Sequence, residues 1–208
     1  MGATLLMDAS DAVRKDRSHL WAGALLFAVA LLASAWFVAF VSDSGERIER
    51  ERMQSLARTA AATLESTNLA GLAASPADIG KPAFNAIRAE LRRVRDVNPD
   101  FRFVYLMRPA PGQPGKMAFM ADAESPESAD YSAPGDVYEG AAEVLGAVFR
   151  TGIAQVEPPT TDDWGTWVTA IAPVRDTTGK VVAVLGMDVN AAAWQATQAG
   201  YRGLALAI

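Results

Sequence analysis

The sequence contains no cysteine and a single histidine, His19. Without cysteine the chain can form neither a disulfide framework nor a thiolate metal site. One histidine excludes a histidine cluster for zinc and a histidine-dependent catalytic triad within this chain. The sequence also has no phosphate-binding glycine loop and no recognisable spacing of nucleophile and base. We therefore expect no metal, no cofactor and no catalysis in these residues.

Basic residues are scarce in the second half of the chain. The formal net charge is -5, and residues 116–200 contain four basic side chains against twelve acidic ones. This balance argues against nucleic acid as a partner, because a phosphate backbone requires a basic surface. An acidic half favours a cationic or amine-bearing ligand.

Charged residues are missing altogether from residues 20–41. As an α-helix, this run is long enough to cross the hydrocarbon core of a bilayer. Residues 33–35 satisfy the small-residue rule of a signal-peptide cleavage site, but the apolar run continues beyond them through Trp36 and Phe40. We therefore expect an uncleaved transmembrane helix in a lipid bilayer.

The charges beside this run indicate its orientation. Residues 1–19 form a short charged leader, and residues 42–46 contain no Lys or Arg. This pattern favours a cytoplasmic leader, which would place residues 42–200 outside the cytoplasm. Residues 201–208 combine an aromatic anchor with an apolar end, so we interpret them as the first turns of a second span, with an output domain beyond them.

The soluble part predicts a mixture of helices and strands. Its apolar spacing, turn residues and caps indicate the following elements: a long helix over 42–69, a helix over 83–97, strands over 101–107 and 116–123, an irregular loop over 124–136, a helix over 137–150, a short strand over 153–157 and a helix from Ala191 capped by Asn190. Pro158 and Pro159 are expected to end the short strand.

A β-hairpin organises the rest of the chain. Residues 164–174 and 181–189 are rich in strand formers, and the turn formers of residues 176–179 join them. Both faces of the second strand are apolar, so Asp188 at its end is costly to bury unless it is paired or hydrogen-bonded. Gly186 leaves room beside it. Asp188 is therefore the first candidate for a ligand contact, the alternative being a cap for the following helix.

Aromatic residues near this hairpin supply further candidates. Trp164 and Trp167 lie three residues apart, so in a regular strand they occupy opposite faces, one in the core and one towards a cavity. Tyr105 lies in the middle of a predicted strand, and its hydroxyl requires a partner. It contacts either the ligand or the core.

The predicted loop at 124–136 is bordered by more candidates. Tyr131 and Tyr138 either close a pocket or hold the loop in place. Asp122 and Glu124 would bind a cation together with Asp188, or they are solvated acids at the end of a strand. The spacing of these acids does not define an acid–base pair.

The motifs FVYLMRPAPGQPGKMAFMADAE and TWVTAIAPVRDTTGKVVAVLGMDV, with GMDV in particular, carry a resemblance to a known family. Residues 42–198 resemble the Cache family, the extracytoplasmic PAS-like sensor domains of bacterial transmembrane receptors, in its single-module form. The resemblance implies an α+β fold: a PAS-like antiparallel sheet with a long N-terminal helix, preceded by the transmembrane helix. It also implies a ligand cavity between the sheet and a covering loop, where Asp188 matches an aspartate that contacts a ligand amine.

The leading expectation is a periplasmic sensor domain of a homodimeric receptor in the bacterial inner membrane, with a histidine kinase or diguanylate cyclase as output. The first alternative is a membrane-anchored protein-interaction module whose cavity is filled by side chains such as Trp167 and Tyr105. The second is an anchored hydrolase that uses Asp122, Glu124 or Asp188. A roomy polar cavity at Asp188 favours the sensor, and a filled one favours the interaction module.

Overall fold

The computed structural model describes residues 3–64, 66–138, 140 and 142–206. It divides into two compact units, Glu46–Gln198 and a second unit made of Met1–Gly45 with Ala199–Ile208. The expected leader and second span each include two residues that lie outside the described ones, at positions 1–2 and 207–208.

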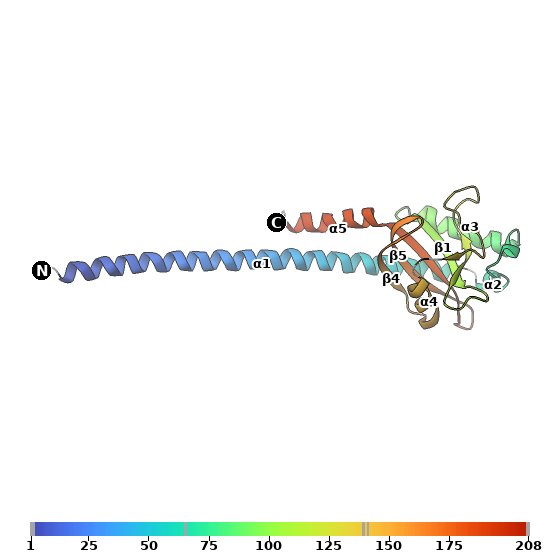
Figure 1. The fold of residues 1–208 in the computed structure, drawn as a ribbon, viewed down its shortest axis with the longest axis horizontal. Coiled ribbons are helices and arrows are strands. Elements are labelled where there is room, and N and C mark those ends of the chain that lie inside the picture. Colours follow the sequence, from blue (N-terminus) through green and yellow to red (C-terminus); the bar gives the residue numbers. More distant parts are fainter. Residues whose placement is uncertain (1–2, 65, 139, 141, 207–208) are drawn as a thin grey trace. The chain divides into compact units, whose positions relative to one another are not determined.

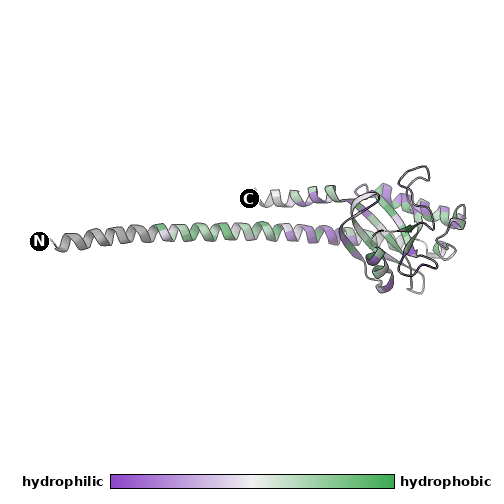
Figure 2. Cartoon of the chain, viewed as in Figure 1, coloured by the Kyte–Doolittle hydropathy of each residue, from purple (hydrophilic) through white to green (hydrophobic). Residues whose placement is uncertain are grey.

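The first helix, α1, is continuous from Ala3 to Thr63 (Figure 1). Hydrophobic residues predominate in it over the uncharged run (Figure 2), and Trp21 and Trp36 are about two-thirds exposed or more. Among the described residues, this is the one helix long and apolar enough, by length and composition, to cross a membrane. The helix expected over residues 42–69 is therefore the last part of α1, and it ends six residues earlier than predicted.

A six-stranded antiparallel sheet forms the centre of the unit Glu46–Gln198, in the order β3-β2-β1-β6-β5-β4. The strands are β1 (Phe103–Pro109), β2 (Met117–Asp122), β3 (Val137–Tyr138), β4 (Gln155–Asp162), β5 (Gly165–Arg175) and β6 (Val181–Asn190). The predicted hairpin is β5 and β6. The predicted α+β fold with an antiparallel sheet and a long N-terminal helix is confirmed.

Helices cover the two faces of the sheet. The residues of β6 that were expected to share one apolar face, such as Leu185 and Met187, pack in one core with α1, α2 (Ser66–Ala70) and α3 (Pro82–Val97). A second core lies on the other face, where Val184 packs with α4 (Ala142–Thr151). The predicted covering of both faces of β6 is therefore confirmed.

Asn190 is the last residue of β6 and directly precedes α5 (Ala191–Leu206). Its side-chain oxygen accepts a hydrogen bond from the backbone N–H of Ala192 at 2.9 Å, which satisfies an otherwise free donor of the first helical turn. The predicted cap is confirmed. Because no loop separates the strand from the helix, the position of β6 determines where α5 starts.

Two predicted elements are wrong in their bounds. The helix expected from residue 137 begins at Ala142, because Val137 and Tyr138 instead pair with β2 as a short edge strand. The strand expected to stop before Pro158 continues to Asp162. Prolines are tolerated there because β4 is an edge strand and its register shifts between Glu157 and Thr160, where no ladder hydrogen bond is lost.

Candidate functional site

A narrow cavity lies beside the end of β6. We call it the Asp188 cavity. Its lining comes from all six strands, from the turn between β4 and β5 and from the covering loop, residues 123–136. It consists of Phe103, Tyr105, Phe119, Asp122, Asp130, Ser132, Tyr138, Asp162, Trp164, Trp167 and Asp188. The space that the centre of a water molecule can occupy is about 20 Å³, enough for one ordered water. The lining is thus acidic and aromatic, and little of the cavity is empty.

Asp188 lies between two neighbouring strands, opposite Phe103 of β1 and Thr169 of β5. Only 5% of the residue is exposed. Burial raises the pKa of its carboxyl group to about 7, the charge of Asp162 adds to the rise, and hydrogen bonds from the hydroxyls of Thr169 and Tyr105 oppose it. The group can therefore gain or lose a proton close to neutral pH.

Tyr105 fills the space that the missing side chain of Gly186 leaves. The two residues are opposite each other in β1 and β6, and a Cβ atom on Gly186 would lie 2.5 Å from Cζ of the Tyr105 ring. From this position the Tyr105 hydroxyl donates to Oδ1 of Asp188 at 3.3 Å. The expectation that Gly186 leaves room beside Asp188 is therefore corrected: the room is taken by Tyr105.

Asp162 is a lining residue that the sequence analysis missed. Its Oδ1 accepts hydrogen bonds from the backbone N–H groups of Trp164 and Gly165 and from Nε1 of Trp167, at 3.0 to 3.2 Å. Its Oδ2 accepts the Tyr138 hydroxyl at 3.1 Å. An aspartate two residues before a Trp-Gly turn is a signal for this local bonding, and it could have been found in the sequence.

Trp164 and Trp167 both line the cavity, so the prediction that they occupy opposite sides is wrong. Trp164 belongs to the turn before β5 and not to a regular strand, and Gly165 has a positive φ of 144° that reverses the chain. Trp164 stacks on Tyr138 with ring centroids 6.4 Å apart. Trp167 meets Phe103 edge to face at 4.9 Å.

Asp122 lines the cavity but is already bonded to the backbone. Its two oxygens accept the N–H groups of Glu124 and Ser132 at 3.0 and 2.9 Å. Burial raises its pKa to about 6, although these bonds lower it. Asp122 therefore shapes the covering loop as well as adding negative charge to the cavity wall.

Glu124 and Tyr131 are not part of the cavity lining. The Glu124 carboxylate accepts from Arg95 at 2.9 Å and from Arg102 at 2.6 Å. The Tyr131 ring lies beneath the Arg88 guanidinium, 5.3 Å from its centroid. The expectation that Asp122, Glu124 and Asp188 share a cation is corrected, and among the described residues no group of three His, Cys, Asp or Glu side chains could hold a metal ion.

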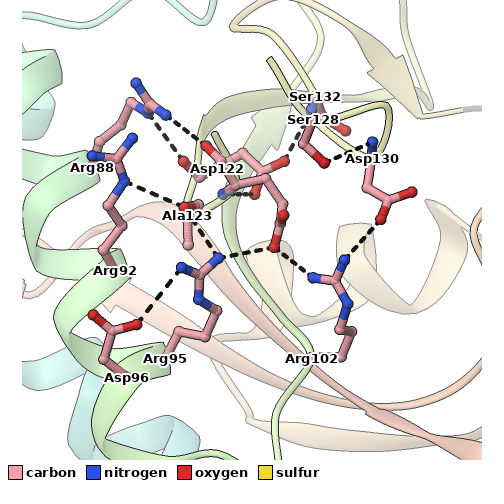
Figure 3. Close-up of polar contacts among 11 residues, drawn as sticks. Arg88, Arg92, Arg95, Asp96, Arg102, Asp122, Ala123, Ser128, Asp130 and Ser132 are labelled. Atoms are coloured by element: carbon pink, nitrogen blue, oxygen red, sulfur yellow. Dashed lines mark hydrogen bonds and ion pairs between the residues drawn. The ribbon is translucent and has the colours of Figure 1, made fainter. Parts of the chain in front are cut away.

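Arginines hold the covering loop against α3. Figure 3 shows Arg88, Arg92 and Arg95 extending from α3 to carbonyl oxygens at Asp122, Ala123 and Glu124. Arg102, just before β1, bonds both Glu124 and Asp130. We call these four arginines the arginine cluster. Three arginines of α3 therefore fix the loop that supplies Asp130 and Ser132.

Solved structures share this fold. The ligand-binding domain of the Campylobacter jejuni chemoreceptor Tlp3, in complex with L-valine, matches with a TM-score of 0.55 and 18% identity over 84% of this chain and 65% of that one. The sensor domain of Escherichia coli DcuS matches with a TM-score of 0.51 and 18% identity over 76% of this chain and 97% of that one. This chain thus spans about two-thirds of the Tlp3 domain.

No protein-family model and no curated protein matches the chain. At these identities the solved structures establish the fold. The chain shares the fold of the Tlp3 and DcuS sensory domains, which is the fold that the resemblance to the Cache family implied.

Proposed function

We propose that this chain is the extracytoplasmic sensor part of a bacterial transmembrane receptor and that it binds a small cationic or amine-bearing molecule at Asp188. The observation that carries the proposal is a buried carboxylate among aromatic rings, in a cavity whose described lining contains no Lys, Arg or His. Strongly perturbed carboxylates in a cleft are typical of functional sites.

The cost of burying Asp188 supports a cationic ligand. A buried carboxylate is unfavourable unless it is paired with a positive charge or well hydrogen-bonded, and the described contacts of Asp188 are two hydroxyl groups. A bound ammonium group would supply the missing charge. The roles of Tyr105, Trp164, Trp167, Tyr138 and Asp122 as ligand contacts are part of this proposal.

The short path from the cavity to the helices supports signal relay. Asp188 is two residues before the Asn190 cap of α5. In the first turn of α5, Trp194 is buried, and the Arg50 guanidinium of α1 lies 5.8 Å from its ring centroid. A ligand that shifts the end of β6 would thereby favour one arrangement of α5 against α1.

The remaining expectations complete the proposal. We place the receptor in the inner membrane as a homodimer anchored by residues 20–41, with the sensor domain in the periplasm. A histidine kinase or a diguanylate cyclase in the cytoplasm would give the output. The solved Tlp3 domain with L-valine supports a small molecule as ligand, and a chemoreceptor output is equally compatible with the fold.

A second candidate is an anchored protein-interaction module. The small volume of the cavity, about 20 Å³, favours it, because Tyr105 and the tryptophans fill much of the space. Its weakness is Asp188, since a filled core has no use for an unpaired buried carboxylate.

A thermal-shift screen of the full chain in lipid nanodiscs tests the proposal. The panel contains alkylamines, amino acids, dicarboxylates and divalent cations. Binding to the folded state raises the unfolding midpoint by mass action. We expect stabilisation by amine-bearing compounds that Asp188→Asn abolishes and Asp163→Asn retains, because Asp163 is exposed in the turn between β4 and β5 and is not part of the lining. Absence of any amine-dependent shift would favour the interaction module.

A further inference from the structure

The charges around the Asp188 cavity restrict the ligand beyond being cationic. We infer that the cavity is built for an organic cation with an apolar body and no carboxylate, an alkylamine or quaternary ammonium compound and not an amino acid. This inference rests on the proposed function and specifies its ligand class.

The first argument is charge balance. Four acidic residues line the cavity, Asp122, Asp130, Asp162 and Asp188, and the described lining contains no basic side chain. A ligand carboxylate would lie among like charges in a poorly hydrated space, where repulsion between charges is stronger than in water. It would also lose its own hydration without gaining a cationic partner.

Arg102, an arginine beside the cavity, is already occupied. The Arg102 guanidinium lies over the Phe103 ring, 4.2 Å from its centroid, so it is close to one wall of the cavity. Its Nη1 bonds Glu124 at 2.6 Å and its Nη2 bonds Asp130 at 2.7 Å. Both ends of the guanidinium fork are thus satisfied by carboxylates of the protein, and a ligand carboxylate would have to displace one of them.

Asp130 is paired with Arg102, and the other three acids differ in how many hydrogen bonds they already accept. Asp162 accepts four donors, and both oxygens of Asp122 accept backbone N–H groups. Asp188 accepts from the hydroxyls of Tyr105 and Thr169. A carboxylate has about four acceptor sites, so Asp188 and Asp122 each retain about two for an ammonium N–H, and Asp188, unlike Asp122, is not tied to the backbone of the covering loop. Asp162 would act chiefly through its charge.

Aromatic rings supply the second half of the site. Phe119 meets the Tyr105, Tyr138 and Trp164 rings edge to face, with centroids 5.4 to 6.3 Å apart. Ring faces attract a cation, and they bury alkyl groups favourably. This combination suits an ammonium group with hydrocarbon substituents better than a hydrated metal ion.

Binding requires the walls to move, since about 20 Å³ does not hold an alkylamine. The stacked pair of Tyr138 and Trp164 forms the part of the wall best placed to open. Both rings are half-buried, and they come from a two-residue edge strand and from a turn. Their separation would admit the alkyl body while Asp188 holds the charge.

Matched pairs of ligands test the inference by isothermal titration calorimetry on the full chain in nanodiscs. The pairs are isobutylamine with L-valine and 2-phenylethylamine with L-phenylalanine, which differ by one carboxylate. Isobutanol controls for the alkyl body and tetramethylammonium for the charge. We expect each amine to bind at least about tenfold more tightly than its amino acid, a difference of about 1.4 kcal/mol.

The variants separate this inference from the proposed function. Asp188→Asn should abolish binding of the amines, whereas Asp163→Asn, which removes an exposed charge from the turn between β4 and β5, should change it less than about threefold. Binding of the amino acids as tightly as the amines would overturn the inference and leave the sensor intact. Binding of neither member of any pair, nor of tetramethylammonium, would overturn both.

Discussion

The ring of Tyr105 on β1 lies against the backbone of Gly186 on β6, and its hydroxyl reaches the Asp188 carboxylate at 3.3 Å. One residue without a side chain thus positions the group that partners the buried acid. The strand that carries Asp188 and the strand beside it are therefore matched in shape at the cavity.

Gly186→Ala tests this match. The added methyl group would overlap the Tyr105 ring, so we expect a loss of about 1 to 3 kcal/mol in the free energy of unfolding and weaker ligand binding. Denaturant unfolding followed by tryptophan fluorescence measures the first effect. In a Tyr105→Ala background, the same substitution should cost much less.

Gly71→Ala is the matched control, because nothing lies within 4 Å of a Cβ atom at Gly71. We expect it to change stability by less than about 0.5 kcal/mol. An equal cost for Gly186→Ala with and without the Tyr105 ring would show that the ring does not set the cost.

The raised pKa of Asp188, about 7 against an ordinary 3.8, predicts a dependence of stability on pH. Between about pH 4 and 7 the folded state keeps a proton that the unfolded state has released, so stability falls as the pH rises through this window and levels off above it. We expect the free energy of unfolding to be lower at pH 8 than at pH 5 by on the order of 3 kcal/mol.

Asp188→Asn should remove most of this slope, as measured by denaturant unfolding at pH 5, 6, 7 and 8. A smaller slope should remain, because burial also raises the pKa values of Asp122 and Glu157. A variant with the same slope as the unmodified chain would assign the pH dependence to other groups.

Ligand affinity should depend on pH in the opposite direction. A cation binds the ionised form of Asp188, so affinity for isobutylamine should rise about tenfold per pH unit up to the pKa near 7 and then level off. Isobutylamine itself stays protonated over this range. Calorimetry from pH 5 to 8 measures the curve, and a flat curve would argue against contact with Asp188.

The arginine cluster predicts a role for Glu124 in the stability of the covering loop. Glu124→Gln removes the negative charge that Arg95 and Arg102 both contact. We therefore expect the free energy of unfolding to fall by about 1 to 2 kcal/mol and amide hydrogen exchange to become faster in residues 123–136. Asp96→Asn is the control, because Asp96 is two-thirds exposed and lies 3.6 Å from Arg95. Equal effects of the two substitutions would contradict this role.

Much of the fold follows from local pattern. The hairpin of β5 and β6, the helix α3 and the Asn190 cap were predictable because apolar spacing, turn residues and a capping side chain agree with one another. The start of α4 and the length of β4 were not predictable from local pattern. In both places pairing with a neighbouring strand overrides the local signal, and that pairing is a long-range property of the sheet.

The site was predictable in part for the same reason. Asp188 was found because a carboxylate ending an apolar strand is unusual in the sequence itself. Asp162 was missed, and the two tryptophans were expected on opposite faces, because the positions of Asp162 and Trp164 depend on a turn whose geometry Gly165 sets. Arg102 and Glu124 lie 22 residues apart, and no local pattern indicates that they meet.

Composition and short-range spacing alone are enough to identify the uncharged run of residues 20–41, the acidic second half and the strand that ends at Asp188. They also exclude cysteine and histidine chemistry. The folded chain is needed to see that Tyr105 occupies the space over Gly186, that Asp162 joins the cavity and that arginines hold the covering loop. These contacts are not visible in the chain order because hydrogen bonding and close packing act between atoms that the fold brings within a few ångströms.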